Sequence, residues 1–175
     1  MGETSKAVVS SRSSSSAEGR DSAGPELACT VATTVQDVSV HHEIRRLVFV
    51  EEQGIFRGSD RDERDDDPAT IKVLGVGGGI AGGAVRLYPL GEPGLWRGDR
   101  LAVLPAFRTH GLGGPLVRFA VRTASELGGE LMVAFIQPQN VGFFHKLGWR
   151  PTGTPRDHVG LPHQRMVTAL HGGRR

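Results

Sequence analysis

Between Leu101 and Gly114 the chain passes from an apolar run, through a proline and a short polar turn, into glycines and then a helical pattern. This order predicts a strand that leads through a glycine-rich turn into a helix from about Gly111 to Leu127. The first turn of a helix presents unpaired N–H groups and the positive end of the helix dipole. We therefore expect the backbone amides from about Thr109 to Gly114 to bind a phosphate or pyrophosphate.

Two familiar phosphate-binding loops do not fit this turn. A Walker loop requires Gly-Lys-Ser or Gly-Lys-Thr, whereas Gly113 is followed by Gly114 and Pro115. A dinucleotide-binding loop requires a third glycine where this chain has Leu116. On this segment alone, the alternative is an ordinary strand–turn–helix whose glycines only allow the chain to turn.

Four segments, in the right order, resemble one known family. Residues 108–113 (R-x-x-G-x-G) match the R/Q-x-x-G-x-G/A signature of the GNAT superfamily of acyl-CoA-dependent N-acetyltransferases. Residues 47–53 resemble the end of that superfamily's first helix, and residues 140–149 resemble its N-x-x-F-Y-x-x-x-G-F segment. Residues 160–166 resemble the G-[IL]-P-H-x-x-M ending of one bacterial subgroup. The resemblance covers roughly residues 28–170.

The resemblance implies an α/β fold with a mixed, mostly antiparallel central sheet and flanking helices, and the apolar periodicity agrees with it. The first helix, expected to be capped by Asp37 and to run to about Gln53, presents Val40, Ile44, Leu47 and Val48 on one face. The helix after the glycine turn is expected to bury Leu112, Leu116, Phe119, Ala120, Thr123 and Leu127. The expected strands are residues 28–34, 70–77, 79–88, 97–104 and 130–136, followed by a short helix from Pro138 and a hairpin of residues 149–154 and 164–170.

The same resemblance implies that the co-substrate is acetyl-CoA. In GNAT enzymes the pantetheine arm lies along a splayed strand edge, and a backbone N–H there stabilises the thioester oxyanion. Glycines in the turn allow the pyrophosphate to approach the backbone closely. The expected cofactor-binding residues are Leu101, Ala102, Val103, Arg108, Thr109, His110, Gly111, Leu112, Gly113, Gly114, Asn140 and Phe143. For Arg108, a solvated position in the turn is an equally good explanation.

Acyl transfer to an amine needs a base, because a free alkyl amine has a pKa of about 10.4 and is protonated at neutral pH. GNAT enzymes often carry a proton-donating tyrosine where this chain has Phe144, and a phenyl ring cannot donate a proton. The candidate catalytic residues are therefore Asp99, His163 and His145. Their alternatives are a salt bridge for Asp99, a structural hydrogen bond for His163 and exposure to solvent for His145.

Residues 60–67 form the most acidic segment of the chain. In GNAT enzymes the loop after the first helix borders the acceptor cleft, so carboxylates there would attract a cationic amine. A solvated acidic loop is the alternative. No metal site is expected, because His41 and His42 are adjacent on a helix and point to different faces.

Composition limits the domain organisation and the partners. The 175 residues are 38% apolar, enough for one core, and the net charge of +2 predicts no strong attraction to nucleic acid or a membrane. No apolar run approaches the roughly 18 residues that span a bilayer. The single cysteine, Cys29, fits a reducing cytoplasm. We expect a disordered Ser/Gly-rich tail over residues 1–26, the domain over 27–170 and a short tail over 171–175.

Two functions follow from the sequence. The first is a cytoplasmic enzyme that moves an acetyl group from acetyl-CoA to a primary amine of a small molecule. A homodimer is one expected state, since dimers are common in folds with exposed sheet edges. The second is a catalytically weak or inert acyl-CoA-binding regulatory module, which the phenylalanine at position 144 favours.

Overall fold

The computed structural model describes residues 23–171, so residues 1–22 of the tail expected over 1–26 and residues 172–175 of the tail expected over 171–175 lie outside this range. Within it, eight strands form a sheet in the order β1-β2-β3-β4-β5-β8-β6, with β7 paired to β8. The strands are β1 (Leu27–Val31), β2 (Ile71–Gly77), β3 (Ile80–Pro89), β4 (Leu95–Val103), β5 (Leu131–Ile136), β6 (Arg150–Pro151), β7 (Arg156–His158) and β8 (Leu161–Ala169). The helical segments are α1 (Val35–Arg45), η1 (Arg46–Glu52), η2 (Glu63–Asp65), α2 (Pro105–Arg108), α3 (Gly113–Glu126), η3 (Pro138–Asn140) and α4 (Val141–Lys146). Among residues 23–171, none of the helices has the length and apolar composition that a membrane span requires.

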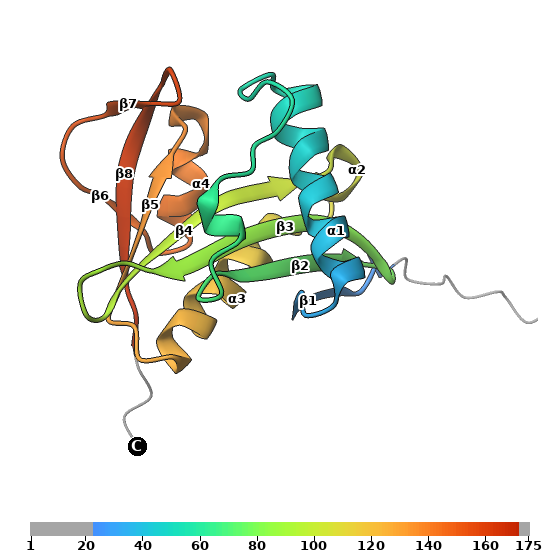
Figure 1. The fold of residues 1–175 in the computed structure, drawn as a ribbon, viewed down its shortest axis with the longest axis horizontal. Helices are drawn as coiled ribbons and strands as arrows, with labels where there is room; N and C mark the ends of the chain where they lie inside the picture. The colour runs from blue at the N-terminus through green and yellow to red at the C-terminus, as the bar shows by residue number, and fades with distance from the viewer. Residues whose placement is uncertain (1–22, 172–175) are drawn as a thin grey trace, which may run out of the picture.

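Helices cover both faces of the sheet. In Figure 1, α1 crosses one face over β2 and β3, and α3 lies behind the sheet. Neighbouring strands are antiparallel except for β4 and β5, which run parallel. The predicted mixed, mostly antiparallel sheet with flanking helices is confirmed. The short strand β7 was not expected from the sequence.

The first helix begins earlier than predicted. Its N-cap is Thr34, not Asp37: the Asp37 N–H donates to Thr34 Oγ1 at 3.0 Å, and the Thr34 N–H donates to the Asp37 carboxylate at 3.3 Å. This reciprocal capping box satisfies two N–H groups that the helix leaves unpaired. The helix continues through η1 and ends before Gly54, which adopts a φ of +61°. Ile44, Val48 and Phe49 pack against the sheet. The spacing of Ile44 and Val48 predicted this for those two residues.

The buried face of α3 differs in part from the prediction. Gly114, Leu116, Val117, Ala120 and Ala124 are buried, whereas Phe119 and Thr123 are half-buried and Leu127 is exposed. The reason is that Gly75 in β2 and Gly83 in β3 leave room for the side chains of Leu112 and Leu116. A Cβ at Gly83 would lie 2.6 Å from a methyl carbon of Leu116. The close approach of helix and sheet therefore depends on a residue without a side chain.

A buried histidine joins α1 to β3. His41 is fully buried, and its Nε2 lies 3.1 Å from the carbonyl oxygen of Val85. A neutral ring donates its Nε2–H to this carbonyl, and burial lowers the pKa of His41 to about 3. In the unfolded chain a histidine has a pKa of about 6.5. Below pH 6.5 the unfolded state therefore binds a proton that the folded state excludes, so acidification favours unfolding.

This linkage predicts a pH-dependent loss of stability. Between pH 7.5 and pH 5, His41 should lower the free energy of unfolding by about 2 kcal/mol. Urea unfolding of the protein and of His41→Gln at both pH values measures the contribution, because glutamine keeps a donor for Val85 and does not titrate. The variant should lose about 2 kcal/mol less on acidification. An equal loss in both proteins would show that His41 does not carry this dependence.

Candidate active site

The strands β4 and β5 separate along their length. They pair only at Leu95–Arg97 and Leu131–Val133, after which β5 continues beside β8 while residues 98–103 of β4 remain beside β3. The separation begins next to a bulge, where the β3–β4 register shifts and Arg100 adopts a φ of +52°. A positive φ is uncommon for a residue other than glycine, and such strain often occurs at functional sites. The result is an opening in the middle of the sheet.

The free edge of β4 supplies backbone donors to this opening. The Leu104 N–H donates to the Gly82 carbonyl on β3. Because N–H and C=O groups alternate in direction along a strand, those of Leu101 and Val103 point away from β3. The Val103 carbonyl accordingly accepts a hydrogen bond from Arg108 Nε at 2.9 Å. Two N–H groups thus face the opening, at the positions expected to contact the pantetheine arm.

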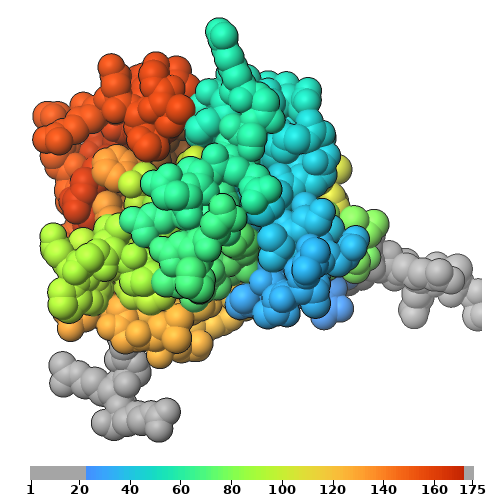
Figure 2. Space-filling model, in the orientation of Figure 1, coloured from blue at the N-terminus to red at the C-terminus, as the bar shows by residue number. Residues whose placement is uncertain are grey.

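A cavity of about 130 Å³ occupies the opening and extends to both faces of the sheet. On the α1 face its wall includes Phe49, Phe56, Phe135, His158 and His163. On the α3 face the lining is apolar and consists of Val117, Ala120, Met132, Ala134, Phe144 and Trp149. In Figure 2, segment 53–70 in teal and green spreads over the α1 face beside the orange C-terminal strands. One cavity therefore has a mixed polar and aromatic end and an apolar end.

The glycine turn leads from the end of β4 to the N-terminus of α3. Arg108, Thr109, His110 and Gly111 are exposed, and Gly111 has a φ of +73°. Among residues 23–171 no side chain caps the N-terminus of α3, so its first N–H groups are available to a ligand. The side chain of Leu112 is fully buried, so only its backbone can serve a cofactor.

Arg108 has a structural role in this conformation. Besides the Val103 carbonyl, its guanidinium bonds Glu52 Oε1 at 2.5 Å and so joins the end of η1 to the end of β4. These contacts fix the carbonyl next to the free edge of β4. They leave Nη1 without a partner among the described residues, available for an anion.

The segment after β5 closes the other side of the opening. Asn140 lines the cavity, and Phe143 is 37% exposed beside Gly113, whose Cβ would lie 3.3 Å from its ring. Phe144, at the position where the family often has tyrosine, is buried and packs edge-on against Trp149 with 5.4 Å between ring centroids. Phe144 thus forms part of the apolar lining and cannot supply a proton.

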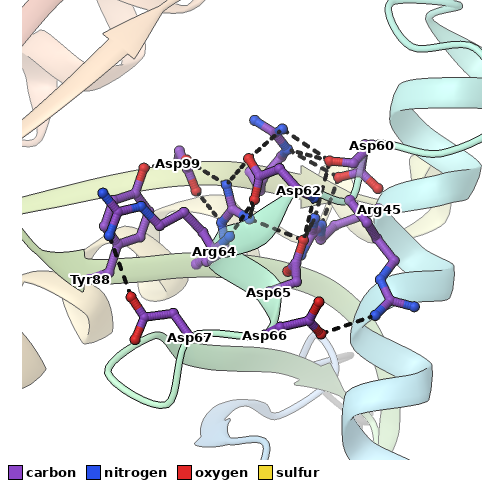
Figure 3. A network of polar contacts seen from close by, with 12 residues as sticks. Arg45, Asp60, Asp62, Arg64, Asp65, Asp66, Asp67, Tyr88 and Asp99 are labelled. Carbon is purple, nitrogen blue, oxygen red and sulfur yellow. Dashed lines mark hydrogen bonds and ion pairs between the residues drawn. The ribbon is translucent and has the colours of Figure 1, made fainter.

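The acidic segment 60–67 folds onto the polar face of the sheet. Arg45 and Arg86 are fully buried. Asp60 pairs with Arg45, Asp62 with Arg86 and Asp65 with both, and Figure 3 shows the three aspartates in this network. Arg45 Nε is 2.7 Å from Asp60 Oδ2, and Arg45 Nη1 is 2.6 Å from Asp65 Oδ1. Arg86 Nη1 bonds Asp62 Oδ1 at 2.6 Å and Asp65 Oδ2 at 3.1 Å. The expectation of a solvated or cation-attracting loop is wrong for these three aspartates, because arginines neutralise them.

The same network of ion pairs also binds the side chain of Asp99. Arg86 Nε and Nη2 donate to the two oxygens of Asp99 at 2.7 and 2.8 Å, and the Tyr88 hydroxyl donates to Oδ2 at 3.1 Å. Burial disfavours the charge on Arg86, but its hydrogen bonds to Asp99 and Asp62 outweigh this and raise its pKa. Burial, together with the Asp99 charge, raises the pKa of Tyr88 to about 12. Asp99 lines the cavity as a carboxylate already bound by three donors.

Of the histidine candidates, the structure brings His163 to the cavity and leaves His145 outside its lining. His163 is buried, and its Nδ1 lies 2.9 Å from the Leu161 carbonyl. If Nδ1 carries the proton of the neutral ring, as this contact indicates, Nε2 is an acceptor. His145 is exposed, with its Nδ1 3.4 Å from the Trp149 carbonyl.

His158 is a cavity residue that the sequence analysis missed. It stacks on Phe135 with 5.8 Å between ring centroids and lies edge-on to His163 at 5.2 Å. Burial, with a further contribution from Arg97, lowers its pKa. The two-residue turn between β7 and β8 has positive φ values at Val159 and Gly160, as a type I′ turn requires. Gly160 was the available signal, since a hairpin centred there brings positions 158 and 163 to one face.

Comparison with known proteins is consistent with this geometry. Residues 67–151 match the acetyltransferase (GNAT) domain. A predicted acetyltransferase of Bacillus subtilis is 32% identical over 136 residues, which cover 77% of this chain and 91% of that protein. The crystal structure of a predicted N-acetyltransferase from Lactobacillus plantarum superposes with a TM-score of 0.73 at 22% identity, covering 82% of this chain and 98% of that one.

A crystal structure of an aminoglycoside 6'-N-acetyltransferase complexed with coenzyme A also shares the fold, with a TM-score of 0.68 at 16% identity over 83% of this chain and 97% of that one. At such identities the two solved structures show a common fold. The B. subtilis relative is matched over most of its length, and this match shows that the two proteins belong to one family. The chain belongs to the GNAT family of acetyltransferases and is an acyltransferase.

Proposed function

We propose that this enzyme transfers an acetyl group from acetyl-CoA to a primary amine of a small molecule. The observation that carries the proposal is the opening between β4 and β5. This opening joins the uncapped N-terminus of α3 to a cavity lined by His158 and His163. The coenzyme A complex of the aminoglycoside acetyltransferase supports an acyl-CoA donor for a chain of this fold. Membership of an enzyme family favours turnover over the binding-only module. A cytoplasmic location and a homodimer stay predictions.

The donor would bind from the α3 face. In this proposal the pyrophosphate meets the N–H groups from Leu112 to Gly114, where the helix dipole favours an anion, whereas the Gly111 N–H already donates to the Arg108 carbonyl at 3.0 Å. The pantetheine arm lies in the opening beside Asn140 and Phe143, and the N–H groups of Leu101 and Val103 polarise the thioester carbonyl. Arg108 holds the strand end and offers a charge near the phosphates.

The acceptor would enter from the α1 face, where His158 and His163 line the cavity. A neutral imidazole takes a proton from the ammonium group, directly or through water, and frees the nitrogen lone pair. The amine nitrogen then bonds to the thioester carbon and the C–S bond breaks. The nitrogen loses a second proton, and the departing coenzyme A sulfur gains one, directly or through water. We assign the base to His163 Nε2, with His158 beside it. Asp99, bound by Arg86 and Tyr88, positions the surrounding groups.

Release of free coenzyme A with a panel of primary amines tests this proposal. The wild type should release it in an amine-dependent manner, with a matching acetylated product in the mass spectrum. His163→Gln should lower kcat by about 100-fold or more, the effect typical of a lost base. His145→Gln should change kcat less than about threefold, since His145 lies outside the cavity lining. Amine-dependent release at an equal rate in His163→Gln would remove His163 from the mechanism.

A further inference from the structure

The charges on the acceptor face bear on the kind of amine that binds there. Asp60 and Asp65 are both buried, and both pair with Arg45; Asp65 also pairs with Arg86. Arg100 bonds the Asp60 backbone and carboxylate at 3.0–3.2 Å. Asp62 is shared by Arg86 and Arg100. The aspartates nearest the cavity therefore already have cationic partners. A second positive charge on the acceptor would find little uncompensated negative charge on this face.

One cation on the same face has no such partner. Arg97 of β4 lies two residues before Asp99 and opposite Tyr88, so its side chain is on the face that carries Asp99. Among the residues that the structure describes, its guanidinium makes no ion pair and no hydrogen bond, and its Nε is buried without an acceptor. The guanidinium carbon lies 4.8 Å from the centroid of the Phe135 ring. A buried guanidinium N–H without an acceptor is costly, so this position is suited to a ligand that supplies one.

The guanidinium of Arg97 adjoins the polar end of the cavity. The Phe135 ring that it contacts also lines the cavity and stacks against His158. Arg97 lies close enough to His158 to contribute to its lowered pKa. An anionic group bound to Arg97 would thus lie near the histidines that face the reacting amine.

We propose that Arg97 binds a carboxylate of the acceptor, so that the substrate is an amine carrying a carboxylate, as in an amino acid. This inference rests on the proposed function and defines its acceptor. A planar guanidinium bonds a carboxylate through two parallel N–H groups, which fixes orientation as well as affinity. A single unpaired arginine matches one negative charge. A phosphate dianion would require a further cation, and the neighbouring Arg86 and Arg100 are already paired.

Matched acceptors test the proposal on the full-length enzyme. The probes are phenylalanine, glutamate and lysine, each with its α-carboxamide and its decarboxylated amine, assayed by coenzyme A release at saturating acetyl-CoA. For at least one set, the acid should exceed its carboxamide in kcat/KM by about 10- to 100-fold, the range of a charge-assisted hydrogen bond. The difference should appear mainly in KM, because Arg97 binds the acceptor and does not move a proton.

Variants of Arg97 separate recognition from fold. Arg97→Gln should raise the KM for the acid about 10- to 100-fold and remove its advantage over the carboxamide, while the KM for acetyl-CoA stays unchanged. Arg97→Lys should recover part of the advantage. Arg122→Gln, an exposed arginine on α3 at the opposite face, is the control and should behave as the wild type. Equal turnover of acid and carboxamide, or an advantage that persists in Arg97→Gln, would overturn this inference alone. Absence of release with every probe and every simple amine would overturn the proposed function with it.

Discussion

Replacing Arg86 with methionine is expected to lower the free energy of unfolding by about 3–5 kcal/mol. Arg86 is fully buried and bonds three carboxylates, those of Asp62, Asp65 and Asp99. Methionine keeps much of the volume but no charge. Asp65 would retain Arg45, whereas Asp99 would retain only the Tyr88 hydroxyl among the partners described above. A buried carboxylate that loses its cation has a large desolvation cost, and this cost is the origin of the expected loss.

Urea unfolding at pH 7.5 measures this effect, with Arg46→Met as the matched control. Arg46 also bonds two carboxylates, those of Glu43 and Glu51, but its side chain is 39% exposed. Exposed ion pairs contribute about 0–1 kcal/mol, so the control should change little. In the double variant Arg86→Met/Asp99→Asn, part of the lost stability should return, because the unpaired charge is gone. Similar losses for Arg86→Met and Arg46→Met would show that burial does not set the strength of the network.

Replacing Gly113 with valine is expected to weaken acetyl-CoA binding by about 100-fold or more. In the proposed complex, the N–H groups at the start of α3 bond the pyrophosphate, and each such bond to a charged group contributes about 1.5–3 kcal/mol. A side chain at Gly113 would project beside these groups, with its Cβ 3.3 Å from the Phe143 ring. Gly113 has no positive φ, so valine there costs the backbone little. Gly111, at a φ of +73°, would be strained by the same change and is the less informative site.

Calorimetric titration with acetyl-CoA measures the dissociation constant of each variant directly. Gly91→Val is the control, because Gly91 is exposed in the turn between β3 and β4 and has no positive φ. Apart from its chain neighbours, no heavy atom lies within 4 Å of the place that a Cβ at Gly91 would occupy. The control should bind as the wild type does, and both variants should retain the far-UV circular dichroism of the parent. Wild-type affinity in Gly113→Val would mean that the pyrophosphate does not lie on this turn.

The parts of the fold that depend on local sequence were predictable. The strand, glycine turn and α3 follow one another within residues 95–126, so apolar spacing and glycines sufficed to identify them. The buried face of α3 was predicted less accurately, because the glycines that leave room for it lie about 30 to 40 residues earlier, in β2 and β3. Packing between elements thus decided which side of the helix is buried.

The candidate site was predictable only in part for the same reason. The ion pairs of Arg86 reach Asp62 and Asp99, 24 and 13 residues away, and no local pattern links these positions. The bulge at Arg100 carries no glycine that would mark a positive φ. His163 was found through its motif, whereas His158 was missed because β7 has three residues and little apolar alternation. Charge along the sequence suggested an acidic loop, and only the fold shows which aspartates are neutralised.

A crystal structure with a non-reactive acetyl-CoA analogue tests most directly whether the opening in the sheet is the donor site. The account predicts pantetheine between β4 and β5, with the carbonyl that replaces the thioester within hydrogen-bond distance of the Leu101 or Val103 N–H. It predicts the pyrophosphate on the N–H groups of residues 112–114. An analogue bound elsewhere, with the opening filled by side chains or solvent, would contradict it.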